Sequence, residues 1–421
     1  MQFEFTQWTQ GRYVPTLGTN AGAEKLPFQT WRNFKEAFAP ELVARAITES
    51  GVPVRRCLDP FGGSGTTALS CQFLNVEPIT IEVNPYLADL IEAKLACYDG
   101  AALIRDFSII YRSVRDSTSS NDLSWLPPTF VEPGVKGRWL FGKEIAQRVE
   151  LYRLSISQLP NSLHRKFFRA ILGGVLVDVS NVTISGKGRR YRKNWESRRL
   201  SPEDVDKIFS ERVKLAAYEI SRYANRTIKS YTIYRDDCRK AITLSPTVDL
   251  AVFSPPYPNS FDYTDVYNIE LWMLGYLNSS SSNRTLRQAT LASHVQIRRN
   301  FAPCPKGSLL LDDISSQLHN KKDKLWNRWI PAMVDAYFAD MQQVMQDITT
   351  RLNARGEIWA VVGDSLYANV HIPVAEILSQ LAPACGLEVL RIESFRSMRT
   401  SAQQGWQQAL AENLIIFRKV E

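Results

Sequence analysis

A glycine-containing loop between a strand-like run and a helix-like run constrains the fold of this chain more than any other feature. The loop reads Asp59-Pro60-Phe61-Gly62-Gly63-Ser64-Gly65-Thr66-Thr67; it follows residues 52–58 and precedes residues 68–74, where apolar side chains recur at helical spacing. Glycines allow a sharp turn and a close backbone approach to a ligand, and a helix N-terminus offers unpaired N–H groups. The pattern predicts a strand–turn–helix unit of an α/β fold with a ligand site at the turn.

The loop departs from two common nucleotide-binding patterns. A Walker loop requires Gly-Lys-Ser/Thr, whereas Thr66 follows Gly65 here, and the spacing is not Gly-x-Gly-x-x-Gly. Residues 77–85 read as a second strand that ends in Glu82, the place where α/β nucleoside sites put a carboxylate on ribose hydroxyls. The alternative is that Glu82 only caps a helix that begins near Pro85.

A second loop, Ser254-Pro255-Pro256-Tyr257, follows the apolar run 248–253, which is typical of a buried parallel strand. Its prolines end the strand and hold the carbonyl groups rigid. Ser254 offers a hydroxyl, Pro255 a fixed carbonyl oxygen and Tyr257 an aromatic face, a set that suits a planar heterocycle with an exocyclic amine. An ordinary proline turn is the alternative for this loop taken alone. Together with the glycine loop, it predicts adjoining pockets for a cofactor and a planar amine.

The two loops resemble those of the S-adenosylmethionine-dependent amino-methyltransferases of DNA, which methylate the exocyclic nitrogen of cytosine or adenine. The resemblance implies that Asp59–Thr67 holds the methionine end of the cofactor, that Glu82 binds its ribose, and that Ser254–Tyr257 is the catalytic loop. The acid expected near the adenine is Asp237, although Asp236 is adjacent and the register is open. The implied cofactor-binding residues are Phe38, Asp59, Pro60, Phe61, Gly62, Gly63, Ser64, Gly65, Thr66, Thr67, Glu82, Asp237 and Cys238, and the implied catalytic residues are Ser254, Pro255, Pro256 and Tyr257.

The resemblance also implies a doubly wound, Rossmann-like methyltransferase sheet in which residues 356–365 form the fifth strand and its loop, and residues 386–392 and 412–418 form a hairpin at the edge. About 150 residues separate Glu82 from Asp237, far more than one helix and strand require. We therefore expect a catalytic domain from residues 1–100 and 228–421 and an inserted, largely helical module over 101–227. A second insertion or mobile loop is expected over 278–330.

The expected insertion reads as helical over 144–159, 162–177 and 202–222, with little strand character. Its segment 186–199 is the most basic part of the chain and carries Tyr191 and Trp195 among its cations, which favours a DNA contact with rings free to stack. A solvated surface is the alternative. The cations expected to contact DNA are Lys187, Arg189, Arg190, Arg192, Lys193, Arg198 and Arg199. Cations between residues 284 and 324 form a second candidate. Asp262 and Tyr263 are candidates for the wall of the base pocket, and packing of Tyr263 and Tyr267 in the core is the alternative.

Composition agrees with this interpretation. The formal charge of +8 favours a polyanionic partner, here double-stranded DNA. The six cysteines have no C-x-x-C spacing and the four histidines form no cluster, so we expect neither a metal nor a disulfide framework. The chain shows no apolar run of membrane-spanning length and no signal pattern, which predicts a cytoplasmic protein that does not contact membranes.

Serine at position 254 favours cytosine N4 as the methylated atom, because related adenine enzymes more often carry Asp or Asn there. N6-adenine methylation, methylation of a tRNA or other RNA base, and a non-catalytic DNA-binding protein remain as alternatives. Methylation of carbon-5 would require a thiolate, and Cys304 in Pro303-Cys304 lies outside a strand-end loop. No convincing nuclease carboxylate site is present, so any restriction endonuclease would be a separate protein in a restriction-modification or related defence system.

Overall fold

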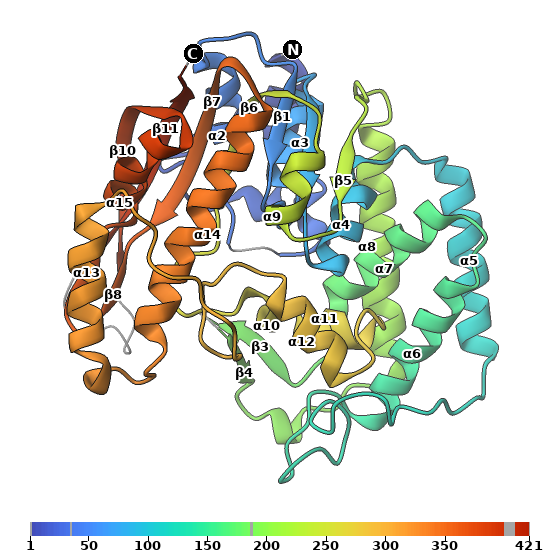
Figure 1. The fold of residues 1–421 in the computed structure, drawn as a ribbon. Coiled ribbons are helices and arrows are strands. Elements are labelled where there is room, and N and C mark those ends of the chain that lie inside the picture. Colours follow the sequence, from blue (N-terminus) through green and yellow to red (C-terminus); the bar gives the residue numbers. More distant parts are fainter. Residues whose placement is uncertain (1, 34–35, 186–187, 400–408, 421) are drawn as a thin grey trace.

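The computed structural model describes residues 2–33, 36–185, 188–399 and 409–420, and its centre is a seven-stranded sheet with the order β10-β11-β7-β6-β1-β2-β5 (Figure 1). The strands are β1 (Arg56–Asp59), β2 (Glu77–Ile81), β5 (Thr232–Tyr234), β6 (Val248–Phe253), β7 (Leu352–Gly363), β10 (Leu387–Arg399) and β11 (Ala409–Lys419). Neighbours from β5 to β7 run parallel, whereas β11 is antiparallel to both β7 and β10. The predicted edge hairpin is therefore confirmed.

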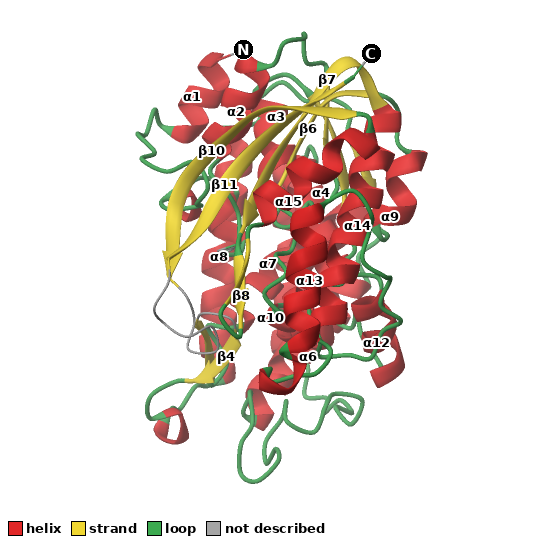
Figure 2. Ribbon diagram, turned by 60° about the vertical axis from the view of Figure 1, so that its left-hand side comes forward, coloured by secondary structure: helices red, strands yellow, loops and turns green. Residues whose placement is uncertain are grey.

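Both faces of the central parallel strand β6 are buried, as expected for a nearly continuous apolar strand inside a parallel sheet. Leu250 and Val252 of β6 belong to one hydrophobic core, and Ala251 and Phe253 belong to another. The first core includes side chains of α2 (Pro40–Glu49), α3 (Thr66–Phe73) and α4 (Pro85–Leu95); the second includes α14 (Ile330–Arg351) and α15 (Val374–Leu381). The sheet lies between these groups (Figure 2), which confirms the predicted α/β, doubly wound architecture.

The three helices predicted between β2 and β5 are present as α6 (Lys143–Ser157), α7 (Ser162–Leu176) and α8 (Pro202–Arg222), and α5 (Gly100–Asp116) precedes them. Asn161 caps α7, and Ser201 forms a capping box with Asp204 at the start of α8. These helices pack on one another, and α7 packs against α4. Their apolar side chains join the first core, so helices α5 to α8 extend the hydrophobic core of the sheet.

Strand structure in the described part of this region is limited to one short hairpin, which agrees with the expectation of little strand character. Strands β3 (Val182–Ser185) and β4 (Gly188–Tyr191) pair antiparallel, and β4 lies in the basic segment 186–199. Val182, Thr183 and Ile184 are β-branched residues that favour a strand, and three arginines nearby obscured this signal.

The remaining α-helices and one further hairpin complete the described structure. They are α1 (Gln2–Thr9), α9 (Cys238–Ala241), α10 (Tyr263–Val266), α11 (Asn268–Met273), α12 (Ser280–Gln288), α13 (Leu309–Asn320) and the hairpin of β8 (Ser365–Tyr367) and β9 (Val370–Ile372). Within the described ranges, no helix is long and apolar enough to span a bilayer.

Candidate active site

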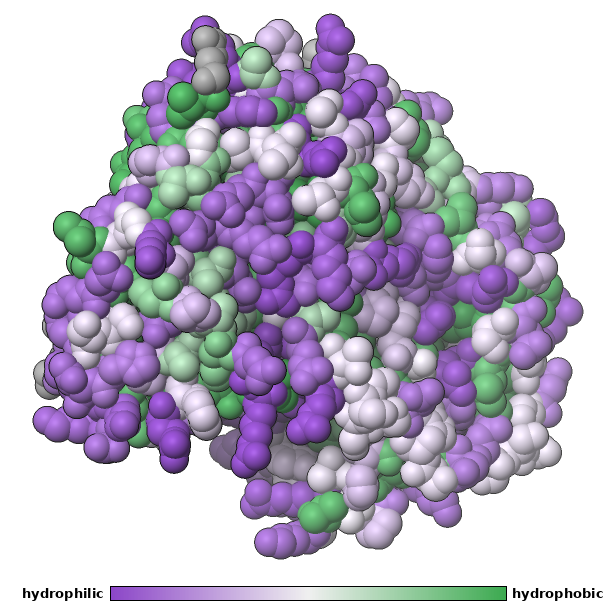
Figure 3. Space-filling model, in the orientation of Figure 1, coloured by the Kyte–Doolittle hydropathy of each residue, from purple (hydrophilic) through white to green (hydrophobic). Residues whose placement is uncertain are grey.

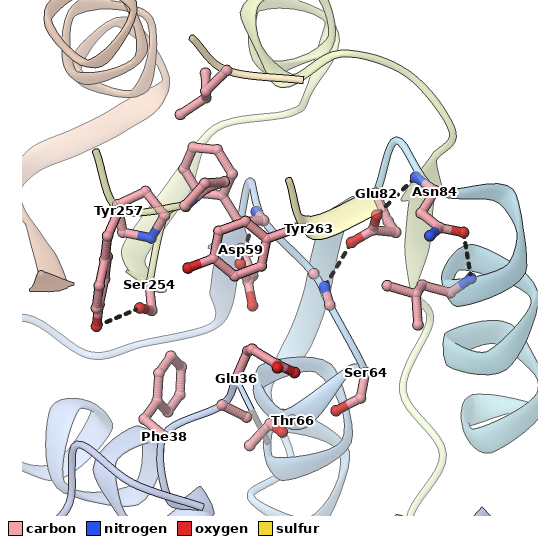
Figure 4. A pocket seen from close by; sticks show the side chains of 18 of the residues that line it. Glu36, Phe38, Asp59, Ser64, Thr66, Glu82, Asn84, Ser254, Tyr257 and Tyr263 are labelled. Carbon is pink, nitrogen blue, oxygen red and sulfur yellow. Dashed lines mark hydrogen bonds between the residues drawn. The ribbon is translucent and has the colours of Figure 1, made fainter. Parts of the chain in front are cut away.

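The two loops singled out in the sequence meet in one cavity of about 610 Å³ at the carboxyl ends of the central strands. β1 and β6 are hydrogen-bonded neighbours, with Leu58 opposite Ala251, so the loops that follow them begin side by side. Such strand ends are where open α/β sheets bind ligands. In Figure 4, Ser254 and Tyr257 lie on one side of the cavity, Glu82 and Asn84 lie on the other, and Tyr263 lies between them.

The glycine loop is packed too tightly for side chains at two positions. A Cβ on Gly62 would lie 2.4 Å from Thr80 Cγ2, and Gly65 has φ +82° with Ile91 2.9 Å from a would-be Cβ. Of the predicted residues in this loop, all except Gly65 line the cavity. Gly65 instead forms the N-cap of α3 and turns the chain into that helix.

A buried lysine that sequence reasoning missed supports this loop from behind. Lys94 of α4 donates to the Ser64 carbonyl at 2.7 Å and to Gln29 Oε1 at 3.1 Å. Burial lowers the pKa of the Lys94 ammonium to about 7. The available signal was a lone cation among the apolar and acidic residues of the run 85–95.

Two buried carboxyl groups face the cavity. Asp59 accepts the Phe61 N–H at 2.9 Å, and burial raises its pKa to about 6. Glu82 accepts the N–H groups of Gly63 and Asn84, each at 2.7 Å. Burial raises the pKa of Glu82 to about 7, to which the nearby charge of Asp59 also contributes. The cap of α4 is Asn84, which accepts from the first turn, so helix capping does not account for Glu82.

The structure places Asp236, and not the predicted Asp237, on the cavity wall. Asp237 caps α9 and binds the Arg239 guanidinium at 2.6 Å, and the same guanidinium binds Asp340 at 2.9 Å. Because the Asp237 carboxylate is committed to these contacts, it points away from the cavity. Cys238, also predicted, does line the wall.

Phe38 lines the cavity as predicted, and its segment is held by residues that the sequence did not reveal. Glu219 of α8 accepts the Phe28 N–H at 2.6 Å, the Thr30 hydroxyl at 2.9 Å and the Trp31 indole N–H at 2.8 Å. Burial raises the pKa of Glu219. An inserted helix therefore fixes the segment that leads to Phe38.

All four residues of the Ser-Pro-Pro-Tyr loop line the same cavity. The Ser254 hydroxyl donates to the Tyr257 hydroxyl at 3.3 Å. The Tyr257 hydroxyl in turn donates to Glu412 of β11 at 3.1 Å. Tyr263 also lines the cavity, whereas Asp262 does not. Asp262 caps α10 and forms an ion pair with Arg287, which keeps its carboxylate out of the cavity.

The segment after α12 forms a further part of the wall; it lies within the second insertion or mobile loop expected over 278–330, but its lining residues were not predicted individually. The lining residues from this segment are Ala289, Thr290, Leu291, Ser293 and His294. Two of the cations proposed here for DNA contact serve the fold: Arg287 pairs with Asp262, and Arg299 donates to the carbonyls of Thr290 and Arg287, each at 2.6 Å.

The cations predicted to contact DNA are of two kinds in the structure: some are bound to groups of the chain itself, and others are exposed. Arg192 donates to the carbonyl of Val177 at 2.9 Å, and Arg198 donates to that of Ser180 at 2.8 Å, so both satisfy carbonyl groups beyond the end of α7. Trp195 is buried against Trp139, which leaves its ring unavailable to stack on a base. Lys187 lies outside the described residues. The other predicted cations are Arg189, which is 3.9 Å from Asp265 of α10, and the exposed Arg190, Lys193 and Arg199.

This arrangement brings the basic hairpin beside the cavity. β4 contacts α10, and α10 contributes Tyr263 and Thr264 to the wall. In Figure 3, which shares the view of Figure 1, the surface is hollowed below its centre and hydrophilic side chains border the hollow. Cys304 is not part of the cavity, and burial with Asp335 and Asp312 nearby raises its pKa to about 11. In the described part of the chain, no group of three metal-ligating side chains is found.

Comparison with known proteins gives relatives over most of the chain, although no family model matches it. It is 25% identical over 404 residues to Type II methyltransferase M.AvaI of Nostoc sp. (strain PCC 7120 / SAG 25.82 / UTEX 2576), covering 87% of this chain and 80% of that protein. It is 22% identical over 432 residues to Type II methyltransferase M.BsoBI of Geobacillus stearothermophilus, covering 89% and 81%. Among solved structures, an rRNA methyltransferase aviRa from Streptomyces viridochromogenes is 10% identical, with TM-score 0.31 over 91% of this chain and 85% of that chain.

Proposed function

We propose that this homologue of Type II methyltransferases is an S-adenosylmethionine-dependent DNA methyltransferase that acts on the exocyclic N4 amine of a flipped cytosine. The observation that carries the proposal is the single cavity walled by both the glycine loop and the Ser-Pro-Pro-Tyr loop. A methyl donor and an acceptor amine must lie within reach of each other, and one continuous cavity provides for that.

The side chains at the glycine-loop end fit the proposed cofactor. The Ser64 hydroxyl is buried without a hydrogen-bond partner and lines the cavity, as expected of a group that a ligand completes. Glu82 has one N–H donor on each oxygen and keeps a lone pair on each for ribose hydroxyls. The Asp59 carboxyl is placed to attract a cationic amine. When bound, S-adenosylmethionine would supply an electrophilic methyl group on a sulfonium centre.

The chain's own residues act on the acceptor amine. The amine lone pair of cytosine is delocalised into the ring, which makes the nitrogen a weak nucleophile. Acceptance of its two N–H groups by Ser254 Oγ and the Pro255 carbonyl would enrich the nitrogen in electron density and fix its direction. The loop needs no covalent nucleophile, and Cys304 lies outside the cavity. Positioning therefore supplies much of the rate.

The exposed cations of the basic segment support a DNA substrate. Arg190, Lys193 and Arg199 offer charge for the phosphate backbone, and β4, which carries Arg190, contacts α10 of the cavity wall. Extruding a base costs a few kcal/mol, which backbone contacts and stacking inside the pocket offset. The designation of both relatives as Type II methyltransferases supports a role in restriction-modification, in which a separate endonuclease would cut unmethylated sites.

The decisive experiment is incubation of the purified protein with methyl-labelled S-adenosylmethionine and DNA that lacks native methylation, followed by mass spectrometry of the nucleosides. We expect labelled N4-methylcytosine. Ser254→Ala is expected to reduce transfer at least about 100-fold, because one of two amine acceptors is lost in a desolvated site. Calorimetry should show cofactor binding within about twofold of the wild type, since Ser254 contacts the acceptor and not the donor.

Other outcomes would redirect the proposal in defined ways. Label on adenine N6 would keep the mechanism and change the base. Label on RNA alone, or cofactor binding without transfer to any nucleic acid, would contradict the DNA methyltransferase proposal and favour an RNA enzyme or a non-catalytic DNA-binding protein. Absence of cofactor binding would contradict the assignment of the glycine loop.

A further inference from the structure

A chain of hydrogen bonds links the catalytic loop to a buried acid on the last strand of the sheet. Ser254 Oγ donates to Tyr257 Oη at 3.3 Å, and Tyr257 Oη donates to Glu412 Oε1 at 3.1 Å. The Glu412 side chain is buried, with 3% of its surface exposed. It lies on β11, far from the catalytic loop in sequence. Figure 4 shows the first of these bonds, with both side chains on the same side of the cavity.

A guanidinium holds the acid in place. Arg396 of β10 faces Glu412 across the strand pair and donates to Oε2 at 2.6 Å from Nε and to Oε1 at 3.2 Å from a terminal nitrogen. Because a carboxylate only accepts, the Tyr257 hydroxyl must give its one proton to Glu412. Burial and the charge of Glu412 raise the pKa of Tyr257 well above its ordinary value, so the phenol keeps its proton to donate.

We propose that Glu412 is a positioning residue that sets the direction of these hydrogen bonds, so that Ser254 presents only lone pairs to the exocyclic amine of the target base. With the tyrosine proton committed to Glu412, Tyr257 Oη accepts from Ser254, and the Ser254 proton points out of the base site. Both lone pairs of Ser254 Oγ remain for amine N–H groups. The inference rests on the proposed function and assigns to it a residue outside the Ser-Pro-Pro-Tyr motif.

Glu412→Gln tests the direction of the bonds with almost no change in volume. The carbonyl oxygen of the new amide is needed at the Oε2 position, where the shorter bond from Arg396 ends. The NH2 group then occupies the Oε1 position and donates to Tyr257. Tyr257 would turn its proton toward Ser254, and the serine proton would point at the incoming amine.

We expect Glu412→Gln to lower kcat about tenfold or more, with little change in KM for DNA or in cofactor affinity measured by calorimetry. In the Tyr257→Phe background, the same substitution should change kcat by less than about twofold, because the intermediate hydroxyl is gone. Glu393→Gln is the matched control: Glu393 lies on β10, the strand paired with β11, and binds Arg45 at 2.8 Å, but it is not in the cavity. This control should keep wild-type kcat.

Each result decides the inference. Wild-type kcat in Glu412→Gln, or an equal loss of kcat with and without the Tyr257 hydroxyl, would overturn the positioning role. A similar loss in Glu393→Gln would do the same, because it would show a general effect of disturbing the strand pair. If the wild type transfers no methyl group to any nucleic acid, the proposed function fails, and the inference that rests on it fails with it.

Discussion

The strand-end loops and the basic segment 186–199 both supplied candidate site residues in the sequence, but the side chains of the two regions have different roles in the structure. In the strand-end loops, the residues chosen from the sequence line one cavity, with Gly65 and Asp237 as the exceptions. In the basic segment, Arg192 and Arg198 are bound to carbonyl groups of the chain and Trp195 is buried. A motif that fixes backbone geometry predicts where side chains point, whereas a count of charges does not.

The physical reason lies in what surrounds each residue. At the strand ends, hydrogen bonding between β1 and β6 brings the two loops together. Prolines restrict the backbone of one loop, and glycines permit the sharp turn and close packing of the other. An arginine is long, carries five donors, and satisfies any nearby acceptor, including the carbonyl groups at the end of a helix. Whether it binds DNA or its own chain depends on tertiary structure that the local sequence does not specify.

The largest difference between the two regions is expected when one glycine in each is replaced by alanine. Gly62→Ala would place Cβ 2.4 Å from Thr80 Cγ2, and we expect it to destabilise the fold by about 1–3 kcal/mol and to weaken cofactor binding at least about tenfold. Gly188→Ala in the hairpin meets no atom within 4 Å and should leave both quantities unchanged. Chemical denaturation and calorimetry measure the two variants side by side. Equal effects would refute the tight packing of the glycine loop.

Within the basic segment, we expect substitution of one cation to lower stability and substitution of another to lower DNA affinity. Arg198→Ala should lower the free energy of unfolding by about 2 kcal/mol, because carbonyl groups lose charge-assisted hydrogen bonds. Lys193→Ala removes an exposed cation and should leave stability unchanged. It should weaken binding to all DNA sequences and reduce the slope of log affinity against log salt by about 1. A loss of DNA affinity in Arg198→Ala without a loss of stability would contradict the structural role.

Features with a local sequence pattern could be predicted, and features that depend on contacts between distant residues could not. The strand–turn–helix unit, the order of strand-end loops and the three inserted helices were recognised because each has a local pattern of glycine, proline or apolar spacing. Lys94, Glu219 and Glu412 were missed because each acts through partners far away in sequence. The sequence offered no means of choosing between the adjacent acids Asp236 and Asp237, and the choice of Asp237 was wrong. Only the fold distinguishes them, because Arg239 binds Asp237 and Asp340.

The smallest expected effect concerns pH, and it tests whether the two buried acids at the strand ends take part in cofactor binding. In the free protein the pKa of Glu82 is about 7 and that of Asp59 is about 6, both raised above their ordinary values mainly by burial. A folded carboxyl with a raised pKa holds its proton more tightly than the unfolded chain does. Its contribution to stability is therefore favourable at low pH and is lost as the pH rises toward 7.

Cofactor binding should depend on pH with the opposite sign. Ribose hydroxyls and a cationic amine prefer ionised carboxylates, so the affinity should fall by about tenfold between pH 8 and pH 6 as Glu82 takes up a proton, as its pKa implies. Glu82→Gln cannot ionise; it should bind weakly at pH 8 and show only the smaller fall near pH 6 that Asp59 causes. The basic hairpin supplies the contrast, because arginines keep their charge throughout this range and DNA affinity should not fall as the pH is lowered. Calorimetry at both pH values, with unfolding followed separately, measures this difference. A cofactor affinity that stays constant from pH 8 to pH 6 would show that neither acid contacts the cofactor, and it would leave the glycine turn alone to explain binding.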